Sequence, residues 1–127
     1  MKLRIKDNSI RLRLTRTEVA TLRDIGTVAS ATGFPGGREL SYRVESSPAS
    51  VSPAAFFSGG SVTVRLPESA VDSWATTEQV SLQGDQLLDD GGQLQILVEK
   101  DFVCLTGRED EDESDMYPHP EADSKSC

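Results

Sequence analysis

The chain carries the same residue pattern twice, and this internal repeat limits the possible folds more than any other feature of the sequence. The segment S-I-R-L-R-L-T-R-T-E-V from Ser9 matches S-V-T-V-R-L-P-E-S-A-V from Ser61, 52 positions further on. Later, L-S-Y-R-V-E from Leu40 matches L-Q-I-L-V-E from Leu94 after a slip of two residues. Because 127 residues is close to the size of one domain, we expect the two halves, about 1–46 and 51–105, to share one core.

Each half is predicted to form mostly strands with one short helix. In the first half, K-L-R-I-K at 2–6 and the alternating apolar residues from 10 to 14 are typical of two strands joined by a tight turn. Thr15 and Glu18 form a capping-box pattern at the start of a helix that ends at Gly26. Further strands are expected around residues 27–31 and 39–45.

The second half is predicted to repeat this order. A helix opens with Pro67 at its first position and places Trp74 in the register of Leu22. Strands are expected around residues 51–57, 62–66, 79–83 and 93–99. Two such units bury their apolar faces best by interleaving. The predicted fold is therefore mainly β, a small pseudo-twofold β-barrel of two fused strand-helix-strand repeats over residues 1–106, with two short helices.

Residues 107–127 differ from the rest of the chain in composition. The run E-D-E-D-E-S-D covers residues 109–115, and Pro118 and Pro120 follow it. Like charges at this density do not share a buried environment, and the prolines prevent a helix or a central strand. We therefore expect a disordered acidic tail after the barrel.

Charge is distributed unevenly along the chain. The whole chain has a net charge of -8, whereas residues 1–43 hold nine basic and four acidic residues. This balance argues against a dedicated binder of duplex DNA or of anionic membranes that works through bulk charge, and it leaves room for a local basic patch. No apolar stretch is long enough to span a membrane, and the first residues lack the apolar core of a signal peptide. We therefore expect a cytoplasmic protein with no membrane partner.

Basic residues occupy alternate positions of the first two predicted strands. They are Lys2, Arg4, Lys6, Arg11 and Arg13. This spacing places them on one face of a hairpin, where they form a cationic stripe for nucleic-acid phosphates or an acidic protein partner. Two other interpretations stay open. The stripe is a solvated face that protects an edge strand from aggregation, or it is a surface onto which the acidic tail folds back, with Tyr117 as an apolar contact.

Part of the second half resembles a known family. The stretch V-T-V-R-L-P-E-S-A-V-D-S-W-A-T-T-E-Q-V-S-L has the strand, L-P, helix, strand pattern of the AbrB-type swapped-hairpin family and its double-psi barrel relatives. The resemblance implies a barrel of that kind. It also implies DNA binding through basic residues on strands, which would be Arg65 and its repeat mate Arg13.

The chain as a whole is similar to a family of small uncharacterised bacterial proteins that share a domain of unknown function. The resemblance lies in the opening K-L-R-I-K, in S-I-R-L-R-L-T, in L-V-E-K-D-F-V-C-L and in the closing E-D-E-S-D-M-Y-P-H-P. It implies a bacterial cytosolic origin and brings no activity with it.

Cys104, His119 and Asp115 are the residues whose chemistry suits a metal, because a thiolate, an imidazole and a carboxylate are ligands of borderline metals. The competing interpretation is that Cys104 is a small buried hydrophobe and that His119 is part of the tail. Catalysis by Cys104 and His119 is not expected, because no third orienting group or oxyanion hole accompanies them. No cofactor is predicted, since the sequence has no phosphate-cradling glycine motif.

These features together predict a non-enzymatic interaction module. Its expected partner is an unknown protein, recognised through the basic hairpin, the acidic tail or both, and nucleic acid is the less favoured partner. Internal duplication favours a monomer, because the second half supplies contacts that another subunit would provide. Two alternatives stay open. One is an AbrB-like nucleic-acid-binding protein with tail autoinhibition that uses Arg11, Arg13 and Arg65, and the other is a metal-binding or redox protein that uses Cys104 and His119.

Overall fold

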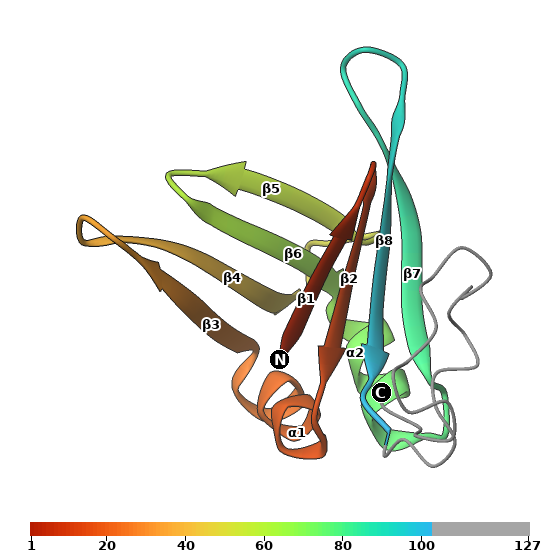
Figure 1. Cartoon of the computed structure of the whole chain (residues 1–127). Coiled ribbons are helices and arrows are strands. Elements are labelled where there is room, and N and C mark those ends of the chain that lie inside the picture. The colour runs from red at the N-terminus through yellow and green to blue at the C-terminus, as the bar shows by residue number, and fades with distance from the viewer. Residues whose placement is uncertain (103–127) are drawn as a thin grey trace, which may run out of the picture.

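A computed structural model describes residues 1–102 of the chain, and these residues form strands and two helices in the predicted order (Figure 1). The elements of the first half are β1 (Lys2–Lys6), β2 (Ser9–Leu14), α1 (Arg16–Ile25), β3 (Thr27–Phe34) and β4 (Arg38–Ser47). The elements of the second half are β5 (Ala54–Ser58), β6 (Ser61–Pro67), α2 (Glu68–Thr76), β7 (Ser81–Leu87) and β8 (Gln93–Lys100). The mainly β fold with two short helices is confirmed.

The strands form two four-stranded sheets, and each sheet takes one hairpin from each half of the chain. Sheet A has the order β1-β2-β8-β7, and sheet B has the order β3-β4-β6-β5. β2 runs parallel to β8 in sheet A, and β4 runs parallel to β6 in sheet B. The repeat pairs each strand of the first half with one of the second half: β1 with β5, β2 with β6, β3 with β7 and β4 with β8. If each strand of sheet A is replaced by the strand it is paired with in this way, its repeat mate, the order of sheet A becomes the order of sheet B read from β5 to β3. The repeat seen in the sequence is therefore a repeat of strand pairing.

The two sheets do not close into a barrel, which corrects the predicted pseudo-twofold barrel. On one side β5 lies against β7, where the Ala55 N–H donates to the side-chain oxygen Oε1 of Gln86 at 2.7 Å. A Cβ added at Gly84 would lie 3.0 Å from the Pro53 ring, so the two edges are in close contact there. Because proline has no N–H to donate, Pro53 cannot extend a backbone hydrogen-bond ladder between these two edges. On the other side, β1 is the edge strand of sheet A and β3 is the edge strand of sheet B, and the two sheets spread apart there (Figure 1).

The core lies between the inner faces of the two sheets and the two helices. Fifteen hydrophobic residues are buried in the described part of the chain, and most of them lie on β2, β4, β6 and β8, at alternate positions in β2, β6 and β8. Trp74 of α2 and Leu22 of α1 are both fully buried, as their shared register predicts. The Trp74 indole N–H donates to the Val80 carbonyl at 2.9 Å, so its one polar atom is satisfied.

The two helices begin in different ways. The capping box predicted for α1 is confirmed, because Glu18 N–H donates to Thr15 Oγ1 at 3.3 Å and Thr15 N–H donates to Glu18 Oε1 at 2.9 Å. Gly26 ends this helix with a φ of 98°, a conformation that suits glycine. In α2 the first helical residue is Glu68, and Pro67 is the N-cap rather than the first helical position. The two-residue slip of the repeat lies between α2 and β7.

Candidate functional site

The outer face of sheet A carries its polar side chains in three rows that run across the four strands from β1 to β7. The base row, next to the helices, consists of Lys2, Arg13, Glu99 and Ser81. The middle row consists of Arg4, Arg11, Leu97 and Gln83. The tip row consists of Lys6, Ser9, Gln95 and Asp85. All five predicted basic residues of the first hairpin thus lie on one face, which we call the cationic face.

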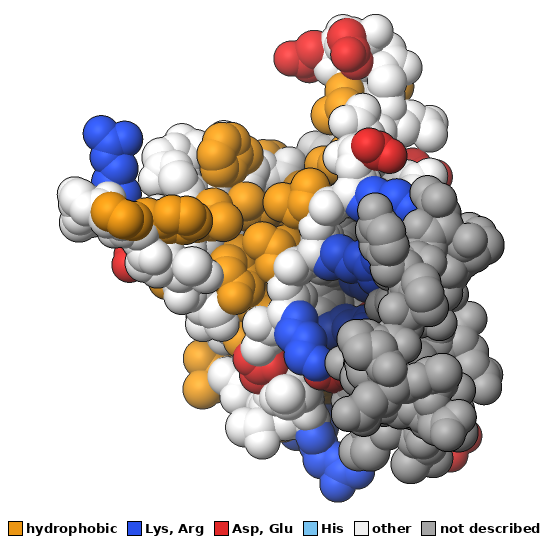
Figure 2. Space-filling model, in the orientation of Figure 1, with side chains coloured by type: hydrophobic (Ala, Val, Ile, Leu, Met, Phe, Trp, Pro, Cys, Tyr) orange, Lys and Arg blue, Asp and Glu red, His pale blue; other side chains and the backbone are white. Residues whose placement is uncertain are grey.

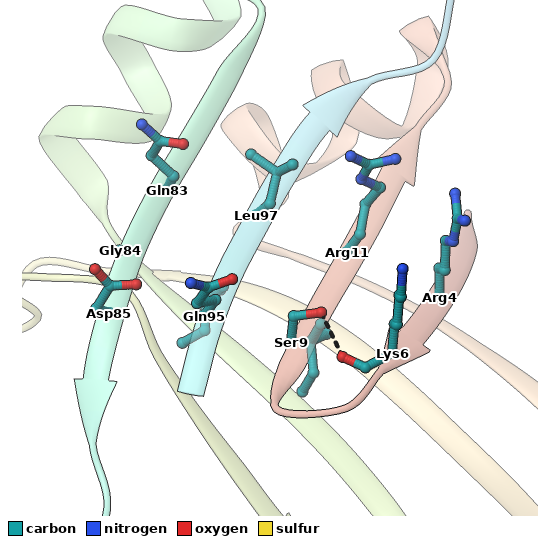
Figure 3. A pocket seen from close by; sticks show the side chains of 11 residues that line it. Arg4, Lys6, Ser9, Arg11, Gln83, Gly84, Asp85, Gln95 and Leu97 are labelled. Carbon is teal, nitrogen blue, oxygen red and sulfur yellow. Dashed lines mark hydrogen bonds between the residues drawn. The ribbon is translucent and has the colours of Figure 1, made fainter. Parts of the chain in front are cut away.

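The middle and tip rows of the cationic face line a hollow of about 780 Å³. Arg4, Lys6 and Arg11 stand on β1 and β2, and Gln83 and Gln95 stand on the other two strands (Figure 3). Cationic donors on one side and amide groups on the other can hold a carboxylate and a peptide group together. Figure 2 shows the Lys and Arg side chains gathered over the β1–β2 hairpin.

Like charges lie directly opposite each other on this face. Arg4 is paired in register with Arg11, and Lys2 is paired with Arg13. Side chains directly opposite on neighbouring strands are close, and like charges at such positions disfavour the sheet. The hairpin therefore concentrates positive charge on one face of the sheet.

The base row contains its own counterions. Glu99 Oε1 lies 2.6 Å from Arg13 Nε and 3.6 Å from Arg11 Nε, and Asp101 lies 3.1 Å from the Lys2 ammonium. The Arg13 and Glu99 side chains are 9% and 14% exposed. The middle and tip rows have one acidic residue, Asp85, at the far strand. The basic residues of these two rows are Arg4, Lys6 and Arg11, and Arg11 also lies near Glu99 of the base row.

The outer face of sheet B has the same three rows with different side chains. Its base row consists of Ala54, Arg65, Glu45 and Thr27. Its middle row consists of Phe56, Thr63, Arg43 and Ala29. Its tip row consists of Ser58, Ser61, Ser41 and Ala31. The charged residues that recur are the Arg and Glu of the base row, with Arg65 Nε 2.6 Å from Glu45 Oε1, and the tip rows share only Ser9 and its repeat mate Ser61.

Arg13 and Arg65 are therefore repeat mates, and each forms an ion pair that joins the two halves of the chain. Each arginine on the second strand of its half contacts a glutamate on the last strand of the other half. The two arginines lie on different sheets, so Arg11, Arg13 and Arg65 do not form one surface. Sequence reasoning missed Glu99 and Glu45 as partners, because their parallel pairing joins residues far apart in the chain.

The predicted metal ligands Cys104, His119 and Asp115 lie outside the described residues, as does the acidic run 109–115. Within residues 1–102 there is no group of three or more His, Cys, Asp or Glu side chains that could hold a metal ion. No helix in this part of the chain is long and apolar enough to cross a membrane.

Comparison with known proteins places the chain in a family. Residues 1–121 match a family described as a family of unknown function, DUF7009. The chain belongs to this family. The family match covers both halves of the repeat and the described residues in full. No curated protein and no solved structure matches the chain.

Proposed function

We propose that the protein is a monomeric, non-enzymatic interaction module that binds an acidic segment of a protein partner on its cationic face. The observation that carries this proposal is the middle row, where Arg4 and Arg11 face each other on adjacent strands. The repeat mates of these residues are Phe56 and Thr63, so the fold does not require arginine there. Two arginines in register on adjacent strands, at positions where the other half of the repeat has Phe56 and Thr63, support a role in recognition.

The composition of the face favours a protein partner over nucleic acid. Glu99 and Asp101 contact the base row, and Asp85 closes the tip row, so a phosphate backbone that tracks the face would meet carboxylates at both ends. The net charge of -8 also opposes a polyanion at long range. A short acidic segment over Arg4, Lys6 and Arg11 does not reach the carboxylates at the two ends, and its few charges meet less long-range repulsion than a longer polyanion does. Gln83 and Gln95 supply donors and acceptors for its peptide groups.

A binding assay with matched variants tests the proposal. The probe is a fluorescein-labelled oligoglutamate peptide, and fluorescence anisotropy reports its affinity for the full chain. Arg4→Ser with Arg11→Thr removes the middle-row arginines, and Arg38→Ser with Arg43→Thr removes the same charge from sheet B. We expect the first double variant to bind about tenfold more weakly, and the second to stay within about twofold of the original protein.

Two results would contradict the proposal. Equal losses in the two double variants would mean that only net charge matters. Tighter binding of a labelled single-stranded oligonucleotide than of the peptide, with a steep dependence on salt, would favour the nucleic-acid alternative. Unfolding in urea is the control for folding, because Arg11 is half-buried near Glu99 and its substitution affects stability more than a substitution at an exposed position does.

A further inference from the structure

β1 is an edge strand of sheet A, and its backbone geometry leaves it able to pair with another strand. A two-residue turn joins Lys6 to Ser9, so these two residues form the hydrogen-bonded pair that closes the hairpin. Hydrogen-bonded and non-hydrogen-bonded pairs alternate in an antiparallel ladder. The N–H and C=O groups of Leu3 and Ile5 therefore point away from β2, toward the edge of the sheet.

β5, the repeat mate of β1, has the same geometry, and an outward N–H group of its edge makes a hydrogen bond. β5 is joined to β6 by a two-residue turn between Ser58 and Ser61, so Ala55 holds the position that Leu3 holds in β1. The Ala55 N–H points outward, as this alternation requires, and donates to Gln86 of β7. β5 is thus covered by β7, whereas β1 faces the side where the two sheets spread apart (Figure 1).

The side chains of β1 fall into two chemical classes by face. Lys2, Arg4 and Lys6 point to the cationic face, and Leu3 and Ile5 point to the inner side of the sheet. Ile5 is 58% exposed although its face is apolar. A strand added beside β1 would place alternate side chains on these two faces. Acidic side chains would meet the cations, and apolar side chains would cover Ile5.

We propose that β1 binds an extended segment of a partner protein that alternates acidic and apolar residues, added as an antiparallel strand at the edge of sheet A. This inference rests on the proposed function and specifies the shape and pattern of the acidic partner. Main-chain hydrogen bonds to Leu3 and Ile5 give affinity, and the two side-chain faces give specificity.

Charge argues against a second copy of the chain as the occupant. Antiparallel pairing of β1 with another β1 would place Lys2, Arg4 and Lys6 opposite the same three cations, and like charges in register are unfavourable. Lysine and arginine on an edge strand are a common protection against self-association. The same three residues attract an acidic strand, so the edge discriminates by charge.

Backbone methylation of a peptide probe tests strand addition. The probe is a labelled peptide with the pattern E-L-E-V-E-L-E, compared with a block peptide of the same composition. In antiparallel addition, the apolar residues lie opposite Leu3 and Ile5 and direct their N–H groups at β1. We expect N-methylation of the apolar residues to weaken binding at least about tenfold, and N-methylation of the glutamates to leave it within about twofold. Binding that survives methylation of the apolar residues would overturn the inference.

A pair of protein variants separates failure of this inference from failure of the proposed function. Ile5→Ser should weaken the alternating peptide and leave oligoglutamate binding unchanged, whereas Phe57→Ser, at the repeat mate of Ile5, should change neither. Both positions are exposed, so both variants are expected to fold. If Ile5→Ser has no effect on the alternating peptide while Arg4→Ser with Arg11→Thr weakens it, strand addition is wrong and the cationic site stands.

Discussion

The outer faces of sheets A and B differ in chemistry although their strands pair in the same register. Both base rows contain an arginine and a glutamate that join the two halves of the chain. The middle and tip rows share no such feature, because sheet A has Arg4, Arg11 and Lys6 where sheet B has Phe56, Thr63 and Ser58. What the two faces share belongs to the fold. What only one face has is the better guide to function.

The shared ion pair also differs in its surroundings. Arg13 and Glu99 are nearly buried in sheet A, whereas the Arg65 and Glu45 side chains are 44% and 25% exposed in sheet B. A buried charge that loses its partner is costly, whereas an exposed ion pair is screened by water and salt. Loss of the Arg13–Glu99 pair should therefore lower the free energy of unfolding more than loss of the Arg65–Glu45 pair.

The largest expected effect is that of Glu99→Gln. This substitution leaves Arg13 buried without the carboxylate that contacts it at 2.6 Å, and breaking such a pair costs about 3 kcal/mol. The free energy of unfolding, measured in urea, should fall by that amount. A loss no larger than that of Glu45→Gln would show that burial does not distinguish the two pairs.

A smaller effect is expected at Glu18 of α1, whose carboxylate lies 2.6 Å from the Met1 ammonium just before the start of β1. Burial raises the pKa of the Glu18 carboxyl, but hydrogen bonds from the Met1 ammonium and from Thr15, together with the charge of the ammonium, outweigh it and hold the pKa below 4.5. Because the folded-state pKa is lowered, the carboxylate stabilises the fold above the unfolded-state pKa, and this stabilisation is lost as the pH falls through the folded-state value.

Glu18→Gln should therefore lower the free energy of unfolding near neutral pH by about 0.5 to 1 kcal/mol, as expected for a charge at a helix N-terminus. The difference from the original protein should disappear once the pH has fallen below the lowered folded-state pKa of Glu18, where the carboxyl is protonated in both states. Chemical unfolding at a series of pH values measures this. A difference that persists in acid would mean that shape, rather than charge, matters at this position.

The smallest expected effect is that of Glu45→Gln. The exposed pair with Arg65 should contribute less than about 1 kcal/mol, and added salt should reduce that contribution further. Urea unfolding at low and high salt measures both. A salt-independent loss as large as that of Glu99→Gln would contradict the difference drawn between the two sheets.

Much of this architecture was predictable from the sequence because it depends on local patterns. Alternating apolar residues predicted the strands, Thr15, Glu18 and Gly26 predicted α1, and the offset of 52 predicted that the two halves fold alike. The alternation of Lys2, Arg4 and Lys6 likewise predicted their common face. These features are set by residues close together in the chain.

Other features depend on contacts that no local pattern encodes. The prediction of a closed barrel was wrong because closure depends on how edge strands meet. Here Pro53 and Gln86 bring β5 and β7 into contact, whereas β1 and β3 remain edge strands of separate sheets. Glu99 contacts Arg13 across 86 residues through a parallel pairing, so the arginine alone gave no sign of its partner. The role of Arg13 in the fold is visible only through that pairing.

The most direct test of the account is to map binding onto the two faces. In a titration of the ¹⁵N-labelled chain with the oligoglutamate peptide, backbone amide shifts report which sheet the peptide contacts. The account predicts shifts at Arg4, Arg11 and Leu97, the middle row of sheet A, and none at the equivalent residues of sheet B, Phe56, Thr63 and Arg43. Equal shifts on both sheets, or shifts confined to sheet B, would contradict it.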